Sequence, residues 1–229
     1  MVPNDNLITT DTTILRGAME ALIQSGKRLV FERCTFDIAD FSRLNLFGSR
    51  FKECYFSETS FYAANLGDTQ WERCRGGQAD FEAADLGEAQ FLACDLNNTK
   101  WRRARLSSAS FKDCKLTGAS FEEIVSLGIT FEDSLLVGAD LRRFSFRKAE
   151  LVGLDFSDAD LAGCDFRDAV FTGGSLRNAN LKLARFEGSD LREVDLGGLK
   201  LVDAKLFKGA TISRHQAAAL LMELGITVA

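Results

Sequence analysis

The sequence predicts an all-β solenoid whose four-sided coils stack on one another, and two periods carry that prediction. From Phe31 to Leu206 every fifth residue is Phe, Leu or Trp, with Gly76 and Ser126 as the exceptions. Cysteine recurs every 20 residues, which corresponds to four such units. A five-residue period fits neither a helix nor a flat strand, whose side-chain periods are about 3.6 and 2 residues. A coil with four short sides, repeated about nine times, satisfies both periods.

Each five-residue unit has two inward positions, the large apolar residue and a small residue two places before it. Ala, Cys, Ser or Thr fills the earlier position in most units, as in Ala159-Asp160-Leu161. The large residues of one side of the coil recur every 20 residues and form an aromatic column: Phe31, Phe51, Trp71, Phe91, Phe111 and Phe131. We expect such columns to be the core.

Charges on the outside repeat at the same one-coil spacing and alternate in sign. The series are Glu82, Arg102, Glu122 and Arg142; Glu32, Lys52 and Glu72; and Arg33, Glu53 and Arg73. Stacked neighbours about 4.8 Å apart favour opposite charges. The charge pattern therefore supports the same coil length as the cysteines do.

The first break in the repeat is Gly76, which leaves one inward position without a side chain. Trp71 stands beside it where most coils have Phe. We expect the indole of Trp71 to lean into the gap.

The second break, at Ser126, is broader, because Ile124 and Ile129 fill the adjoining small positions. We expect the coil within residues 121–146 to be distorted, and Val125 and Leu127 to be exposed. Two interpretations stay open: a local bend, or a patch that contacts a partner.

Residues 1–28 lie outside the five-residue register. Apolar residues from Ile14 to Ile23 follow a helical period, with Thr10 or Asp11 as the expected N-cap and Ser25-Gly26 as the end. Because a solenoid end exposes apolar cross-section and unpaired backbone, we interpret this helix as a lid; a partner-binding amphipathic helix is the alternative. The expected organisation is a cap at 1–28, the β-helix at 29–210, and a C-terminal cap at 211–229.

The C-terminal segment opens with Ser213-Arg214-His215-Gln216, a capping box that predicts a helix. Gly225 is expected to end this helix. Its candidate capping and dimer residues are apolar: Ala217, Leu220, Leu221, Leu224 and Ile226. This helix either caps the solenoid only, or caps it and joins two copies.

No catalytic, cofactor-binding or metal-binding site is predicted. The six cysteines occupy inward small positions, and we interpret them as structural thiols rather than as a metal ladder or disulfides. His215 is the only histidine, and no Gly-rich phosphate loop, nucleophile elbow or zinc motif occurs. We therefore expect a protein that is not an enzyme and has no cofactor.

Composition restricts the partners. The net charge of −5 and the pI near 5.1 argue against direct nucleic-acid binding. No apolar run approaches the length of a membrane helix, and the start does not resemble a signal peptide. A bacterial cytoplasmic location is expected, without membrane contact.

Units such as Ala179-Asn180-Leu181 match the motif A-(D/N)-L-x-x, and the chain resembles the pentapeptide-repeat family over about three quarters of its length. That resemblance implies a right-handed quadrilateral parallel β-helix. Residues 216–226 resemble the C-terminal helix of Qnr-type quinolone-resistance proteins, and the uninterrupted coils resemble MfpA-like members. These likenesses imply a homodimer through the C-terminal helix. They also imply a DNA mimic that binds DNA gyrase or topoisomerase IV and protects it from quinolones or a related antibiotic.

The sides of the coil that carry Phe31 and Phe36 have more acids than bases. The candidate contact residues on them are Asp95, Glu132, Asp133, Glu150, Asp155, Asp158, Asp190 and Asp195. Their alternative role is solvated surface charge. The alternative function is a scaffold or effector that binds another protein, with two basic patches as contacts: Lys100, Arg102, Arg103 and Arg105; and Arg142, Arg143, Arg147 and Lys148.

Overall fold

The computed structural model describes residues 6–198, 205–222 and 225–228. The chain divides into two compact units, residues 1–131 and 132–229. Both units are built from the parallel β-solenoid that the two sequence periods predict. Each unit is described in turn.

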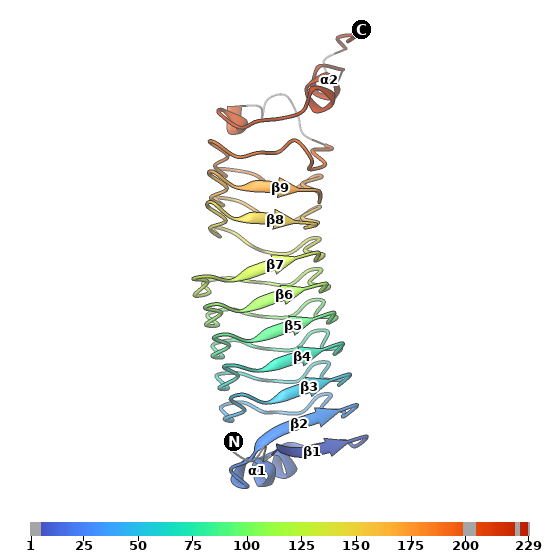
Figure 1. Cartoon of the computed structure of the whole chain (residues 1–229), viewed down its shortest axis with the longest axis vertical. Coiled ribbons are helices and arrows are strands. Elements are labelled where there is room, and N and C mark those ends of the chain that lie inside the picture. The colour runs from blue at the N-terminus through green and yellow to red at the C-terminus, as the bar shows by residue number, and fades with distance from the viewer. Residues whose placement is uncertain (1–5, 199–204, 223–224, 229) are drawn as a thin grey trace, which may run out of the picture. The chain divides into compact units, whose positions relative to one another are not determined.

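Unit 1 contains a ladder of parallel strands on one side of the coil (Figure 1). Each strand is centred on one residue of the aromatic column, so Phe31 pairs with Phe51 and Trp71 with Phe91. The strands of unit 1 are β1 (Asn6–Thr10), β2 (Arg28–Glu32), β3 (Arg50–Lys52), β4 (Gln70–Glu72), β5 (Gln90–Leu92) and β6 (Ser110–Lys112). The boundary with unit 2 falls within β7 (Thr130–Glu132).

The other three sides of the coil are held by single parallel bridges at the same 20-residue offset. Thr35 pairs with Tyr55, Asp40 with Ser60, and Asn45 with Asn65, and each series continues along unit 1. Together with the strand ladder this gives four bridged sides per coil. The four-sided coil is therefore confirmed.

Corners between the sides use the left-handed backbone conformation, in most cases without glycine. Arg33 and Arg43, for example, have φ of 52° and 61°. This conformation is unfavourable for a residue with a Cβ atom. It is compensated here because the corner N–H bonds to the next coil: Arg33 donates to the carbonyl of Lys52 at 2.9 Å.

The core of unit 1 consists of stacked aromatic columns, as expected. Trp101 lies parallel to Phe81, with ring centroids 4.2 Å apart, and is completely buried. Its indole N–H, which would otherwise be an unpaired buried donor, bonds to the hydroxyl of Thr99 at 2.8 Å. Trp71 has the same arrangement with Thr69. Threonine in the small position therefore supplies the hydrogen-bond acceptor that a buried tryptophan in the column needs.

The prediction for Gly76 is wrong in one respect. The space that a side chain would need there is filled by the ring of Phe56, since a Cβ atom built on Gly76 would lie 1.7 Å from Phe56 Cε2. Trp71 stays in its own column, parallel to Phe51 at 3.9 Å, and meets the Phe56 ring edge-on at 4.9 Å. The side chain that fills the gap is therefore that of Phe56, from the preceding coil on the same side, and not that of Trp71.

The N-terminal end contains a strand that the sequence pattern did not predict. β1 pairs with β2 at an offset of 22 residues, with Asn6 opposite Arg28. Asp11 does not cap the helix as expected: it turns the corner with φ of 53°, and its carboxylate accepts a 2.7 Å hydrogen bond from Arg33 Nε. Thr10, the other expected cap, is the last residue of β1.

Helix α1 (Arg16–Gln24) therefore begins five residues after Asp11 and has no side-chain cap. It ends as predicted at Ser25, and Gly26 follows with φ of 67°. Met19 is its fully buried residue, and Arg16 bonds to the carbonyls of Asp40 and Ser42 in the next coil. These contacts fit the lid interpretation.

Around Ser126 the backbone keeps the turn-and-bridge pattern of the other coils, so the expected distortion is absent from the local backbone. The difference lies in the side chains. Ile124 and Ile129 are only half-buried in positions where Ala or Cys is buried elsewhere. Val125 and Leu127 are 51% and 82% exposed, as predicted.

Unit 2 repeats the same architecture. Its strands are β8 (Glu150–Val152) and β9 (Val170–Thr172), and Glu132 at the end of β7 pairs with Val152. Its aromatic column runs Phe146, Phe166, Phe186, with centroid distances of 5.1 and 4.9 Å. Phe144, which occupies a small position, is accommodated because its ring stacks on Phe146 at 4.5 Å.

Helix α2 (Arg214–Met222) lies at the C-terminal end of unit 2. The predicted capping box is confirmed: Gln216 N–H bonds to Ser213 Oγ at 3.2 Å, and Ser213 N–H bonds to Gln216 Oε1 at 2.6 Å. The amide Nε2 of Gln216 also donates to the carbonyls of Leu191 and Val194, each at 2.7 Å. One side chain therefore both caps α2 and attaches it to the last regular coil.

Candidate functional site

The outer surface carries the candidate contact residues, and the structure divides the eight predicted acids into two groups. In the first group each carboxylate accepts the backbone N–H two residues further on and so holds a corner of the coil. This group comprises Asp95, Asp155, Asp190 and Asp195. A carboxylate that holds a corner in this way has a structural role in the coil.

Two acids of this group are also paired with arginine. Asp190 binds Arg192 through two hydrogen bonds from Nε, at 2.9 and 3.0 Å, and one from Nη2. Asp195 accepts from Arg177 at 2.8 and 3.0 Å. The neighbouring guanidinium lowers the pKa of Asp190 below its ordinary value. These two positions add little negative field to the surface.

In the second group Asp133, Glu150 and Asp158 are exposed, and none of these three forms an ion pair among the described residues. Glu132 is half-buried beside Asp133. All four belong to the sides that carry Phe31 and Phe36. The candidate acidic surface is therefore narrower than the sequence predicts.

Both basic patches are largely neutralised by acids of the same unit. In unit 1, Arg102 faces Glu122 at 3.7 Å, Arg103 faces Glu123 at 3.1 Å, and Arg105 faces Asp85 at 3.8 Å. In unit 2, Arg142 binds Asp140 and Arg147 faces Asp168. Neither patch presents a strong positive field.

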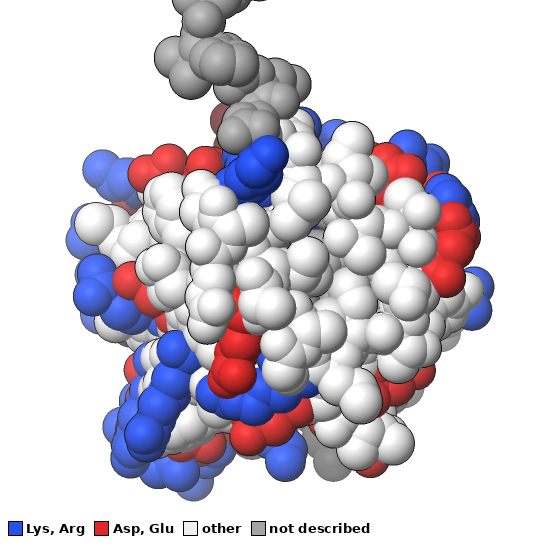
Figure 2. Space-filling model, turned by 90° about the horizontal axis from the view of Figure 1, so that it is seen from below, with Lys and Arg blue, Asp and Glu red and all other residues white. Residues whose placement is uncertain are grey.

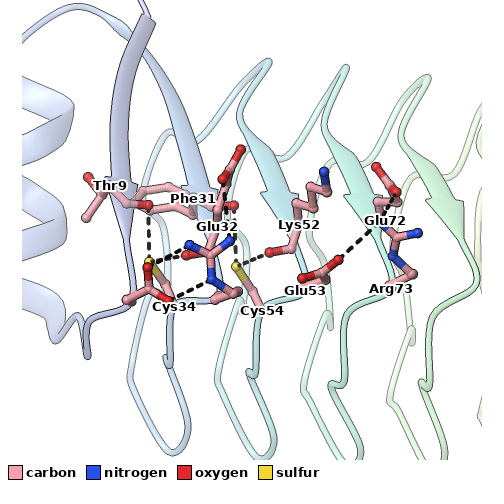
Figure 3. Close-up of polar contacts among 11 residues, drawn as sticks. Thr9, Phe31, Glu32, Cys34, Lys52, Glu53, Cys54, Glu72 and Arg73 are labelled. Carbon is pink, nitrogen blue, oxygen red and sulfur yellow. Dashed lines mark hydrogen bonds and ion pairs between the residues drawn. The ribbon is translucent and has the colours of Figure 1, made fainter.

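The predicted ladder of alternating charge is present at the corner beside β2 to β4 (Figure 3). Arg73 binds Glu53 of the preceding coil at 3.1 Å and Glu72 of its own coil at 2.8 Å. These groups are about half exposed, so each pair contributes at most about 1 kcal/mol. Their effect is to align neighbouring coils rather than to stabilise them strongly.

Behind this ladder lies the column of cysteines (Figure 3). All six cysteines are buried and free. Each thiol has a backbone carbonyl as acceptor: Cys34 donates to Thr9 at 3.3 Å, and Cys74 to Phe51 at 3.3 Å. Burial raises the pKa of Cys164 to about 12. Burial therefore favours the neutral, unreactive thiol at Cys164. At Cys54 and Cys94 the hydrogen bond with a neighbouring cysteine lowers the pKa, so protection from reagents rests there on burial.

We predict that none of the six thiols of the native protein reacts rapidly with Ellman's reagent, and that all six react after unfolding in urea. The reason is that burial hides the sulfur atoms from the reagent. Stopped-flow absorbance measures both phases. Rapid reaction of any native thiol would contradict the structural interpretation.

Unit 2 contains a partly buried surface ion pair between Asp165 and Arg167. Asp165 accepts from Arg167 Nε at 2.8 Å and from the backbone N–H of Arg167 at 3.2 Å. The guanidinium hydrogen bond lowers the pKa of Asp165 to about 2. The two side chains are 21% and 25% exposed, so water screens the pair only in part.

We predict that Asp165→Asn removes part of the acid sensitivity of folding. A carboxyl group whose pKa is lowered in the folded state stabilises that state above the unfolded pKa, near 3.8, and loses this contribution as pH falls toward 2. Asparagine keeps the acceptor for the corner N–H but cannot pair with Arg167. Urea unfolding at pH 7 should show a loss of about 1 kcal/mol, which shrinks as pH falls through the folded pKa and disappears below about pH 2. A loss that is independent of pH would contradict this account.

The sequence did not reveal a hollow of about 490 Å³ in unit 2, between α2 and the last regular coil. It is lined by Arg177, Arg192, Glu193, His215, Gln216 and Leu220. His215 therefore lies beside two arginines that are already paired with aspartates. The hollow exists because α2 is held through Gln216, a contact that no local pattern could indicate.

Of the candidate dimer residues, Leu221 and Ile226 are 38% and 48% exposed, whereas Ala217 and Leu220 are half-buried. Leu224 lies outside the described residues. Met222 and Val228 add 64% and 45% exposed side chains to the same end of unit 2. This end therefore presents apolar surface.

Comparison with family profiles decides which family this architecture represents. The profile of the pentapeptide repeat region matches residues 27–101 and 69–141. The profile of eight pentapeptide repeats matches residues 128–163, 151–188 and 175–206. The chain belongs to the pentapeptide-repeat family. The matched residues that the structure describes up to residue 198 coincide with the regular coils of both units.

Among solved pentapeptide-repeat structures, those of QnrB1, a plasmid-mediated fluoroquinolone resistance protein, are similar to this chain. A trypsin-treated form is 24% identical, with a TM-score of 0.75, over 85% of this chain and 97% of that one. A second treated form and the full-length form are each 21% identical over 96% of this chain and 100% of theirs, with TM-scores of 0.75 and 0.54. These likenesses establish the shared fold.

Comparison with curated protein sequences found no match. Within the described residues no helix has the length and apolarity needed to cross a bilayer. In the same residues no group of three or more His, Cys, Asp or Glu side chains is placed to hold a metal ion.

Proposed function

We propose that this pentapeptide-repeat protein is a non-enzymatic binding protein that engages a type II DNA topoisomerase, DNA gyrase or topoisomerase IV, and protects it from quinolones or a related antibiotic. The observation that carries the proposal is the similarity to QnrB1, a fluoroquinolone resistance protein, which extends over 97% of its trypsin-treated form. The C-terminal helix that resembles those of Qnr-type proteins adds support, since it is attached to the last coil through Gln216.

In this proposal the protein acts as a DNA mimic through the acids that remain unpaired. Asp133, Glu150 and Asp158 are exposed on the sides that carry Phe31 and Phe36. Duplex DNA carries one negative charge per about 1.7 Å, so three outward acids imitate only a short stretch of backbone. Recognition then rests on a few positioned carboxylates together with the shape of the coils.

A homodimer through α2 is the second part of the proposal. Leu221, Met222 and Ile226 leave apolar surface exposed at the end of unit 2, and a two-fold contact would cover the same patch on both copies. Met222→Glu places a charge in that contact and should weaken it. Light scattering of the two proteins measures the change.

The decisive experiment is a DNA supercoiling assay with purified gyrase and ciprofloxacin. The protein should restore supercoiling in the presence of the drug. The triple variant Asp133→Asn, Glu150→Gln, Asp158→Asn should need about tenfold more protein for the same effect, which corresponds to about 1.4 kcal/mol of binding energy. If the parent protein neither inhibits nor protects at micromolar excess, the topoisomerase proposal fails.

A matched control removes the same charge from the other two sides of the coil. Asp80→Asn, Glu82→Gln and Glu88→Gln lie on the sides that carry Phe41 and Leu46, and these three acids form no ion pair among the described residues. This control should protect gyrase as well as the parent does. Equal losses in both triple variants would show that only total charge matters and would exclude a positioned acidic surface.

A second candidate function is a scaffold that binds a different protein. It is favoured by the exposed apolar pair Val125 and Leu127, which a freely solvated coil has no reason to keep. Replacing both residues with serine should leave gyrase protection unchanged. Loss of protection would place this pair within the topoisomerase contact.

A further inference from the structure

β1 is the terminal strand of its sheet, and its outer edge is open among the described residues. β2 pairs with one edge of β1, and the order of described strands ends at β1 on the other. Figure 1 shows β1 as the lowest strand, with α1 to its left in this view. An unpaired edge of this kind is a template for another strand.

The direction of the backbone groups identifies the residues at this edge. Asp11 directs its N–H toward β2, where it bonds to the carbonyl of Glu32 at 3.1 Å. Alternate residues of a strand direct their backbone groups to opposite edges. Asn6, Ile8 and Thr10 therefore present N–H and C=O groups to the open edge.

β1 lacks the features by which proteins block edge pairing. Its sequence, Asn-Leu-Ile-Thr-Thr, contains no charged residue and no proline. The Ile8 side chain is 61% exposed. Of the two charges that flank the strand in the sequence, Asp11 is neutralised by Arg33 at 2.6 Å, and Asp5 lies outside the described residues. Within β1 itself, no charge or proline blocks pairing at the open edge.

The surrounding end face suits an identical partner. Figure 2 shows this end with uncharged residues over most of its centre and most charged groups near its rim. Arg16 and Glu20 of α1 pair with each other at 2.9 Å. Although the chain carries a net charge of −5, two copies can meet here without strong like-charge repulsion.

Nearby side chains support an interface at this end. Leu15 is 63% exposed and Ile38 is 78% exposed. Ile38 also holds a left-handed corner with φ of 62°, a costly conformation for a β-branched residue. The equivalent corners of the next two coils carry Glu58 and Gln78. Neither solubility nor backbone preference explains isoleucine at this corner.

We propose that a second copy of this chain adds its own β1 to this edge, antiparallel across a two-fold axis. Ile8 then lies opposite Ile8 of the other copy, and Asn6 lies opposite Thr10. In this register the three outward backbone pairs of each strand find partners in the other strand. The Ile8 side chains pack against each other across the axis and become buried.

The first test uses Met222→Glu protein, so that any contact through α2 is weakened and the proposed function is not involved. Ile8→Pro removes an N–H that faces the open edge and leaves the β1–β2 ladder intact. Ile8→Thr keeps the N–H and a β-branched side chain and is the matched control. The readout is the molar mass from light scattering at increasing protein concentration.

We expect Met222→Glu protein, with or without Ile8→Thr, to approach twice the 25.2 kDa chain mass. With Ile8→Pro it should stay at the chain mass. A monomeric Met222→Glu protein at several hundred micromolar would overturn the proposal, and so would an unchanged mass after Ile8→Pro.

A second test does not depend on proline being tolerated. Directly opposed residues of a hydrogen-bonded antiparallel pair have Cα atoms about 5.5 Å apart, within reach of a disulfide. Ile8→Cys in the Met222→Glu background should therefore form a covalent dimer when glutathione disulfide is added, while the six native thiols stay buried. Leu183→Cys in unit 2, where the native side chain is 74% exposed, is the control. Dimer formation no faster than in that control would overturn the proposal.

Discussion

Gly76→Leu is expected to destabilise unit 1 by about 3 kcal/mol or more, although it restores the apolar residue that the repeat requires. The ring of Phe56 already fills the position, with three of its atoms 1.7 to 2.3 Å from where a Cβ atom would stand. Phe56 is held by Trp71 at 4.9 Å and Phe61 at 5.9 Å, so its ring cannot withdraw without disturbing both neighbours. Urea unfolding measures the loss.

Two further variants separate overpacking from other effects. Gly87→Leu places the same side chain at an outer position where a Cβ atom has only ordinary contacts, and it should be nearly neutral. Phe56→Ala together with Gly76→Leu should be more stable than the sum of the single losses, because the leucine then has space to enter. Strict additivity of the two substitutions would show that Phe56 does not fill the gap.

Phe91→Ala should cost about 3 to 5 kcal/mol, the usual loss when a buried aromatic ring leaves a cavity. Phe91 is 1% exposed and lies between Phe111, with centroids 4.8 Å apart, and Trp71 at 5.6 Å. Trp101 meets its edge at 5.6 Å. Loss of this ring therefore removes contacts to two columns of the core.

The matched control is Phe47→Ala, which deletes the same side chain from a position that is 60% exposed. The loss of stability should be below about 1 kcal/mol, since folding buries little of the apolar surface of Phe47. The free energy of unfolding from urea titrations, monitored by tryptophan fluorescence, compares the two. Equal losses would mean that the aromatic column does not provide the main stabilisation.

The regular coils were predictable because their cause is local and repeated. The alternation of large and small inward residues recurs at each side, and stacking at one-coil spacing turns it into columns such as Phe31, Phe51 and Trp71. The repeat did not predict β1. It pairs at an offset of 22 residues and places Thr9 opposite Phe31, so it has neither the period nor the aromatic residue.

The candidate surface was predictable only in part, because charge along a sequence does not show how side chains pair. Counting acids by side identified Asp133 and Glu150, which are exposed, but also Asp190 and Asp195. The latter two face arginines from their own corner or from the preceding coil. A carboxylate is paired when a guanidinium lies about 3 Å away. A count of acids on each side does not give that distance.

The sequence by itself determined the four-sided coil, the inward columns, the structural role of the cysteines and membership of the pentapeptide-repeat family, because each follows from a period that many residues share. Only the tertiary structure decided that Phe56 fills the space at Gly76, that Gln216 attaches α2 to the last coil, and that β1 is the terminal strand among the described residues. The physical reason is the same in each case. These features depend on single contacts between residues distant in sequence, and a period carries no information about a contact that occurs once.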